Sequence, residues 1–353
     1  MGRASLIGFC LSAVLALVST AGAQSHYKVM DIGTIGGSSS FGNGINTPGQ
    51  TAGASDTTGD AALHAFFGTP PQRLHDLGTL GGPSSSALAI NDHTDIVGQA
   101  DKADGTSDAF LWVDGTMKDL LTLGGSLSAA TAINFSAPPE AFTQIAGWSL
   151  ITGDIAFHAA IWDASEHIGD LGTLGGTNSF AFGNNCVQQV VGNSDTAPPP
   201  LGPGTTDAFL WDSVHGMQDL GTLGGSFAQA NGINCPGVIV GFSTLLGDLQ
   251  SDAFIDQGGT MKDIGNLGGS ASHANAINDS GLVVGFSNTT GDTDVHAFRW
   301  SSSKGMEDLN GLIPATSGWD LNSANSVSKR GEIVGNGTHN GAFHAFVLIP
   351  VFP

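Results

Sequence analysis

Charged side chains are scarce in this chain of 353 residues: they make up 12% of it, about half of the roughly 25% that is usual in globular proteins. Glutamate and lysine, which favour helices, occur only four and six times. This scarcity excludes a mainly helical protein, a coiled coil and a βαβ enzyme. Because 40% of the residues are hydrophobic and the charge is spread along the chain, the sequence is not that of a disordered protein either.

Basic residues are especially few, with ten Lys and Arg against 31 Asp and Glu, which gives a formal net charge of −21. A basic stripe for nucleic acid is therefore absent, and phosphate backbones are repelled. Anionic membrane surfaces are disfavoured for the same reason. Cations, neutral sugars and peptides suit such a surface better.

Long apolar runs are also lacking, except at the N-terminus. Arg3, the apolar run 6–18 and the small residues 21–23 occur in the order of an export signal. We predict a signal peptide over residues 1–23, removal of which leaves a mature chain 24–353. No other segment is long enough to span a bilayer, so no membrane insertion is predicted. The sequence leaves open whether the protein stays in the periplasm or reaches the outside medium.

Familiar catalytic motifs are missing. The chain has no Gly-x-Ser-x-Gly, no His-Glu-x-x-His, no Walker loop and no cysteine pair at zinc spacing. Carboxylates from distant segments can still meet on one face of a fold. An extracellular polysaccharide hydrolase or lyase that uses such carboxylates therefore stays open as an alternative function.

Glycine, by contrast, is abundant, with 53 residues, and much of it lies in a repeated phrase. Asp-Leu-Gly-Thr-Leu-Gly-Gly begins at Asp76, Asp170 and Asp219, and variants begin at Asp31, Asp119, Asp263 and Asp308. These aspartates follow one another at intervals of 43 to 51 residues. A period of this length is typical of propeller blades and other repeat architectures.

Two further landmarks keep the same period. One is an Asn followed by a Gly, usually seven residues further along the chain. The first residue of this pair is Asn46, Asn91, Asn134, Asn185, Asn234 or Asn278, and in the last unit Ser328 takes the place of the Asn. The other is His/Asp-Ala-Phe, which begins at His64, Asp108, His158, Asp207, Asp252, His296 and His344. Each unit contains four short apolar segments separated by turn residues, which is the content of a four-stranded blade.

The two ends of the chain carry complementary fragments of one unit. The phrase at Asp31 has no His-Ala-Phe strand before it, and the strand at His344 has no Asp-Leu-Gly strand after it. We therefore predict an all-β fold: one seven-bladed β-propeller of four-stranded antiparallel blades over residues 24–353. In this fold the N-terminal strand, residues 27–32, closes the last blade by pairing with residues 343–349. Pairing of the ends also hides strand edges that would invite aggregation.

The glycine of the second strand in each unit is expected where a neighbour approaches closely. We predict that this neighbour is the Phe or Trp of the His-Ala-Phe strand. On that basis Gly285→Val should cost about 1–3 kcal/mol.

These phrases together resemble the HAF family of bacterial extracellular repeat proteins, and the resemblance covers nearly the whole mature chain. It implies an exported bacterial protein and a propeller fold. The family has no generally established activity, so the resemblance implies no catalytic residues. The departures at 184–185, Ala160 and 313–314 do not challenge the fold.

The repeated polar positions are candidate ligands. The His or Asp before each Ala-Phe suggests a ring of metal ligands or bases. A residue repeated in every unit is usually structural, however, so the preferred interpretation is a hydrogen bond from this side chain to the backbone where the strand begins.

No cofactor is predicted. The weak calcium candidates are the Asp-rich loops at Asp56, Asp60, Asp101, Asp104, Asp292 and Asp294, which fit no twelve-residue calcium loop and suit Asx-turns better.

Cys186 and Cys235 directly follow the landmark Asn in adjacent units. Export would place them in an oxidising compartment. A disulfide between them is attractive, but equivalent atoms of neighbouring blades can lie beyond the Cα limit of about 7 Å. The sequence leaves both states open.

Residues that break the repeat are better functional candidates than residues that keep it. The insertion in the third unit carries Glu140, with Trp148 following, and the degraded seventh unit carries Trp319, Arg330 and His339. We predict that Glu140, Trp148 and Trp319 bind the ligand of a non-catalytic protein, which recognises a carbohydrate, a peptide or a cell-envelope component through loops on one face. A purely structural or assembly role is the third alternative, and the oligomeric state is left open.

Overall fold

The computed structural model describes residues 26–134, 143–163, 165, 167–197 and 204–351. The predicted signal peptide 1–23 and the candidate Glu140 lie outside these residues. The described chain is all-β, with 28 strands and two short 3-10 helices, η1 (Thr290–Asp292) and η2 (Leu309–Leu312). Within it, no helix is long and apolar enough to cross a membrane.

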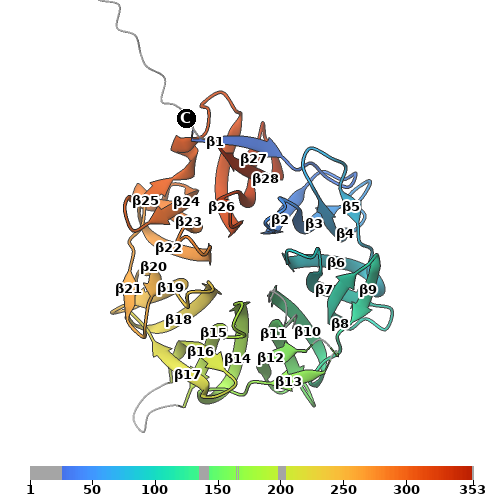
Figure 1. Ribbon diagram of the computed structural model, residues 1–353, viewed down its shortest axis with the longest axis vertical. Helices are drawn as coiled ribbons and strands as arrows, with labels where there is room; N and C mark the ends of the chain where they lie inside the picture. Colours follow the sequence, from blue (N-terminus) through green and yellow to red (C-terminus); the bar gives the residue numbers. More distant parts are fainter. Residues whose placement is uncertain (1–25, 135–142, 164, 166, 198–203, 352–353) are drawn as a thin grey trace, which may run out of the picture.

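The strands form seven groups, which we call units 1 to 7, arranged around a common centre (Figure 1). The strand of each unit nearest the centre comes first: β2 (Ser40–Ile45), β6 (Gly81–Ile90), β10 (Gly124–Ile133), β14 (Gly175–Asn184), β18 (Gly224–Ile233), β22 (Gly268–Ile277) and β26 (Trp319–Val327). The second strands are β3 (Thr51–Asp56), β7 (Ile96–Lys102), β11 (Ile145–Ile151), β15 (Val190–Thr196), β19 (Ile239–Leu245), β23 (Val283–Thr289) and β27 (Ile333–His339).

The third and fourth strands lie farther out. The third strands are β4 (Leu63–Gly68), β8 (Ser107–Val113), β12 (Phe157–Trp162), β16 (Thr206–Asp212), β20 (Ser251–Asp256), β24 (Val295–Ser301) and β28 (Ala342–Pro350). The fourth are β5 (His75–Asp76), β9 (Thr116–Asp119), β13 (Ile168–Asp170), β17 (Gly216–Gly221), β21 (Met261–Asp263), β25 (Gly305–Asp308) and, in unit 7, β1 (Tyr27–Asp31). Strands within each unit pair antiparallel, so the loops after the second and fourth strands share one face.

The N-terminal strand β1 pairs with the C-terminal strand β28. Tyr27 lies opposite Pro350 and Asp31 opposite Phe346. The hydroxyl of Tyr27 accepts a hydrogen bond of 3.1 Å from Arg299 Nη1 of β24, and the guanidinium lies over the Tyr27 ring. Unit 7 thus takes its outermost strand from the other end of the chain, and this strand is anchored on unit 6 as well.

The cores lie between neighbouring units. The phenylalanines of the His/Asp-Ala-Phe strands are fully buried: Phe66, Phe110, Phe209, Phe254, Phe298 and Phe346. In unit 3, where Ala160 replaces this Phe, Trp162 is fully buried instead, and its Nε1 donates a 2.7 Å hydrogen bond to the carbonyl of Leu120. A large aromatic side chain therefore fills the core of this unit too.

The second-strand glycines have a closer neighbour than the sequence indicates. A Cβ added to Gly285 would lie 2.9 Å from the ring of Phe298, as predicted, but it would overlap the backbone carbonyl oxygen of His273 in the adjacent inner strand even more severely. The same overlap with an inner-strand carbonyl occurs at Gly53, Gly98, Gly147, Gly192, Gly241 and Gly335. The inner strand carries a β-bulge at this point, which pushes its backbone toward the glycine.

Candidate functional site

The repeated His or Asp at the start of each third strand faces the Asp of the Asp-Leu-Gly phrase. In four units this pair is His–Asp, with Nδ1 2.7–3.0 Å from the carboxylate: His64–Asp76, His158–Asp170, His296–Asp308 and His344–Asp31. The predicted backbone partner is therefore wrong, because the partner is a carboxylate on the adjacent strand. These pairs, which we call dyads, join the third strand to the fourth.

The carboxylate of each dyad also holds the turn that follows it. Asp76 accepts from the N–H of Gly78 at 2.8 Å, and Asp170 accepts from that of Gly172 at 2.7 Å. Such Asx-turns use the carboxylate for local structure. The dyad carboxylates of units 1 and 3 are therefore used for local structure.

In the other three units two aspartates meet. Burial raises the pKa of Asp207, and the neighbouring Asp219 carboxylate raises this pKa further. One buried oxygen of Asp207 has no hydrogen-bond partner. In unit 2, by contrast, Lys102 reaches Asp108 and Asp119 at 2.8 Å each, which raises the pKa of Lys102. An ionised acid pair is costly unless a cation joins it.

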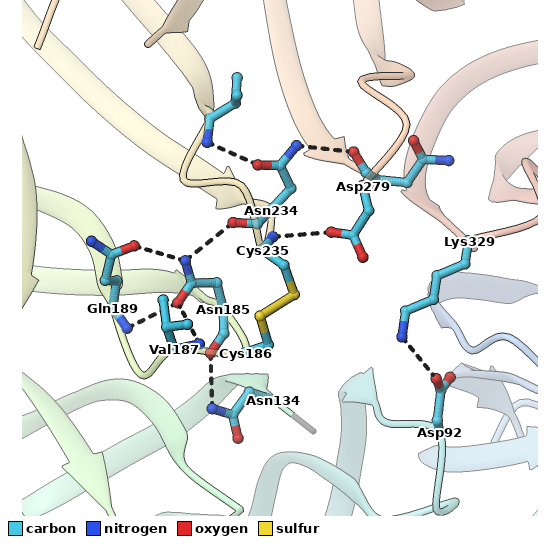
Figure 2. The surroundings of a disulfide bond; sticks show 12 residues. Asp92, Asn134, Asn185, Cys186, Val187, Gln189, Asn234, Cys235, Asp279 and Lys329 are labelled. Carbon is cyan, nitrogen blue, oxygen red and sulfur yellow. Dashed lines mark hydrogen bonds and ion pairs between the residues drawn. A yellow bond between two sulfur atoms is a disulfide. The ribbon is translucent and has the colours of Figure 1, made fainter. Parts of the chain in front are cut away.

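The landmark asparagines connect neighbouring units near the centre of the molecule (Figure 2). Asn185 Nδ2 donates to the carbonyl of Asn234 at 3.1 Å, and Asn234 Nδ2 donates to that of Asn278 at 3.1 Å. Their side-chain oxygens accept from backbone N–H groups four residues on, at Gln189 and Val238. Asn46, Asn91, Asn134 and Asn278 donate to the next unit in the same way. Because the side-chain amides of these asparagines form hydrogen bonds within the protein, they offer few free donors or acceptors to a ligand.

A disulfide joins Cys186 to Cys235 beside these asparagines (Figure 2). Their Cα atoms are 5.4 Å apart, which lies within the usual range for a disulfide. The turns after the inner strands converge toward the centre, so equivalent residues of neighbouring units come closer there than at the rim. The bond therefore ties unit 4 covalently to unit 5.

The predicted calcium candidates are dispersed, and several serve loop structure. Asp60 Oδ1 accepts from the N–H of Ser38 at 2.7 Å, and Asp292 Oδ1 accepts from that of Ser270 at 2.7 Å. Asp104 Oδ1 accepts from the N–H and the hydroxyl of Thr106. Asp56, Asp101 and Asp294 join no group of three His, Cys, Asp or Glu ligands among the described residues. Among the residues that the structure describes, no three of these candidates therefore converge on one point.

Trp148 packs between units 3 and 4. Its ring lies 5.4 Å from that of Phe157 and 5.9 Å from that of Phe180 on the neighbouring inner strand, both edge to face. The indole is partly buried. This position gives Trp148 a packing role between units.

Trp319 lies in a different setting, at the edge of unit 7. A cavity of about 450 Å³, here called the seam cleft, is lined by Lys28 and Asp31 of β1, Pro314 and Ser317 of the segment after η2, Trp319 of β26 and His339 of β27. The Trp319 indole stacks flat on the His339 ring, with centroids 4.6 Å apart and planes 3° from parallel. Aromatic, charged and hydroxyl groups therefore converge on one concave surface.

His339 turns the unit 7 dyad into a three-residue cluster. Its Nδ1 lies 2.9 Å from Asp31 Oδ2, and His344 Nδ1 lies 2.9 Å from the same oxygen. Burial opposes ionisation of Asp31, but hydrogen bonds from His344, His339 and the N–H of Gly33 outweigh it and hold the pKa of this carboxyl below its usual value. Within the described ranges this is the one group of three such residues whose ligand atoms all lie within 4.8 Å of one another.

The sequence singled out Trp319 and His339 because they break the repeat, but it missed Lys28 and Asp31. Asp31 belongs to a repeated phrase and is 308 residues from His339 along the chain. The signal that could have found it is the predicted pairing of the chain ends, which brings Asp31 beside the third strand of unit 7.

No protein-family model and no curated protein matches the chain. Among solved structures, the β-propeller domain of the Trilobed protease from Pyrococcus furiosus is similar, with 11% identity, a TM-score of 0.55 and coverage of 88% of this chain and 93% of that one. This likeness shows a propeller-like fold and nothing about a ligand.

Two further solved structures are less similar to this chain. TolB from Acinetobacter baumannii has 15% identity and a TM-score of 0.49 over 72% of this chain. The match spans 62% of the TolB chain, less than two thirds of its length. The BP39L lectin from Burkholderia pseudomallei has 11% identity and a TM-score of 0.49, with coverage of 93% of this chain and 98% of that one.

Proposed function

We propose that this protein is an exported, non-catalytic binding protein that recognises a carbohydrate in the seam cleft. In this proposal the fold is a seven-bladed propeller, the seven units are its blades, and β1 completes the last of them. The pairing of β1 with β28 and the four-strand content of each unit support this architecture. The resemblance of the repeats to the HAF family supports membership of that family.

Export is supported by two features. The predicted signal peptide 1–23 precedes the first strand. The disulfide between Cys186 and Cys235 is of a kind that persists in oxidising compartments outside the cytoplasm.

The observation that carries the binding proposal is the gathering of repeat-breaking residues in one cleft. Trp319, Ser317 and His339 line it together with Lys28 and Asp31. Outside unit 7, in contrast, the repeated polar residues face one another in pairs or form inter-unit hydrogen bonds. An aromatic side chain beside hydroxyl, cationic and carboxylate groups suits a sugar, whose apolar face packs on a ring while its hydroxyls form hydrogen bonds.

A glycan-array screen of the mature chain, followed by titration calorimetry with the best ligand, tests this function. Trp319→Ala should weaken binding about tenfold or more, because central aromatic anchors commonly contribute more than about 1.4 kcal/mol. Trp148→Phe, which changes an indole packed between units, serves as the matched control and should bind as the unaltered protein does.

Equal affinity of the Trp319→Ala variant would reject the seam cleft as the binding site. Binding of peptides alone would reject the carbohydrate class. A polysaccharide-degradation assay, run beside the array, addresses the hydrolase or lyase alternative, and any release of products would overturn the non-catalytic assignment.

A further inference from the structure

His339 occupies a position in its strand from which a side chain can reach the dyad of unit 7. It is the fourth residue after the second-strand glycine, Gly335, and its counterpart in unit 2 is Lys102, the fourth after Gly98. Lys102 bridges Asp108 and Asp119, the two acids at the corresponding positions of unit 2, at 2.8 Å each. The equivalent residues in the other units are Thr57, Ile151, Thr196, Leu245 and Thr289. Unit 7 alone therefore places an imidazole at this position.

The resulting cluster has the donor atoms of a transition-metal site. Two imidazole Nδ1 atoms and one carboxylate oxygen converge, and the N–O distances are 2.9 Å. In a tetrahedral zinc site with bonds of about 2.0–2.2 Å, neighbouring donor atoms are about 3.4 Å apart, so a small outward movement of the side chains would admit an ion. Imidazole nitrogen favours zinc, copper, nickel and iron, whereas calcium takes oxygen ligands.

The three side chains are accessible and held in place. Their exposed fractions are 27% for His339, 21% for His344 and 29% for Asp31, so an ion can reach them from solvent. The flat stack on Trp319 fixes the plane of the His339 ring, and the N–H of Gly33 orients the Asp31 carboxylate through a 2.7 Å hydrogen bond. Such outer contacts commonly orient the ligands of metal sites.

We propose that Asp31, His339 and His344 bind a divalent transition-metal ion of the zinc class, which clamps β1 to β27 and β28. The three ligands come from these three strands, one of which lies at the other end of the chain. Because Asp31 and His339 also line the seam cleft, the remaining coordination position faces that cleft and is open to water or to a donor atom of a ligand. The site goes beyond the proposed carbohydrate binding and does not depend on it.

Zinc chloride is the probe, and the protein is the mature chain without a polyhistidine tag, treated with EDTA and dialysed. Calorimetry should detect one tight zinc equivalent, and zinc should raise the melting temperature. His339→Thr installs the residue found at three equivalent positions and leaves the dyad intact. It should weaken zinc binding at least about tenfold, since even outer-shell changes cost about 10–100-fold, and it should abolish the zinc-dependent rise in melting temperature.

His158→Asn is the matched control, because its dyad with Asp170 has no third ligand, and it should keep the tight zinc equivalent. Equal zinc affinity of the His339→Thr variant and the unaltered protein, or absence of a tight equivalent, would overturn the proposal. If His339 only forms a hydrogen bond, His339→Thr lowers the melting temperature equally with zinc and with EDTA. Glycan titrations in EDTA keep a failure of the carbohydrate proposal distinguishable from a failure of the metal site.

Discussion

At the residue scale, the same position of the repeat is filled by two chemically different side chains. Where it is His, an imidazole meets a carboxylate at hydrogen-bond distance, as in His158–Asp170. Where it is Asp207, an acid meets the acid Asp219, and burial raises the pKa of Asp207. The repeat therefore carries a built-in source of pH dependence in unit 4.

Asp207→Asn should stabilise the protein at pH 7 by about 1 kcal/mol, because an amide can donate a hydrogen bond to Asp219 where two carboxylates repel each other. The pKa of Asp207 is raised in the folded state, so its favourable contribution is full below the unfolded value of 3.8 and is lost as the pH rises through the folded value. The advantage of the variant should therefore shrink as the pH falls toward 4. Urea unfolding at several pH values measures it.

Asp248→Asn is the control for net charge. The N–H of Ser226 holds the pKa of Asp248 below its ordinary value, so this change removes the same charge without relieving repulsion between acids, and it should not stabilise the protein. A gain in stability of equal size in both variants would show that net charge, and not the acid pair, is responsible.

At the element scale, each unit depends on close contact between its first and second strands. At Gly285 the bulged inner strand presents the carbonyl of His273 where a Cβ would be, and the Phe298 ring fills the remaining space. A side chain can change rotamer, but a paired backbone carbonyl cannot move away without disturbing the sheet. The cost of any side chain here therefore exceeds the expectation based on aromatic packing alone.

Gly285→Ala should lower the free energy of unfolding by about 3 kcal/mol or more, at the upper end of the range for overpacked sites. Gly311→Ala serves as the control, since an added Cβ meets nothing within 4 Å there, and it should be close to neutral. Both are measured by urea denaturation. A Gly285→Ala protein as stable as the control would contradict the backbone overlap.

At the scale of the whole molecule, unit 7 depends on strands from both chain ends. Without β1, strand β28 would expose its outer edge, and the buried side chains Tyr27 and Ile32, with 2% and 5% exposure, would be lost. An exposed edge of this kind also promotes association between molecules.

A chain that begins at Gly33 should therefore be less stable than one that begins at Gln24. Loss of two buried side chains is worth about 3–6 kcal/mol, which corresponds to a melting temperature lower by about 5–15 °C. Calorimetry gives the melting temperature, and light scattering reports association. Identical melting of the two chains would contradict a stabilising role for the paired ends.

Much of the fold could be predicted from the sequence because its signals are local and repeated. Period and turn residues predict an all-β, propeller-like chain, and the complementary end fragments predict the pairing of the two end strands, now seen for example between Asp31 and Phe346. The candidate site could be predicted only in part. Trp319 and His339 stand out as departures from the repeat, whereas Asp31 looks like every other aspartate of its phrase.

The sequence by itself determined the all-β character, the repeat period and the phenylalanine positions of the repeated third strand, because these follow from patterns within about 45 residues. Only the tertiary structure decided which partner each repeated polar group takes, that Cys186 and Cys235 come within bonding distance, and that Asp31 meets His339 and His344. These outcomes depend on how units and chain ends approach one another in space. A few ångströms in the distance between units or chain ends decide whether two groups form a disulfide, a hydrogen bond or a metal site, or make no contact. The spacing of residues along the chain does not encode this distance.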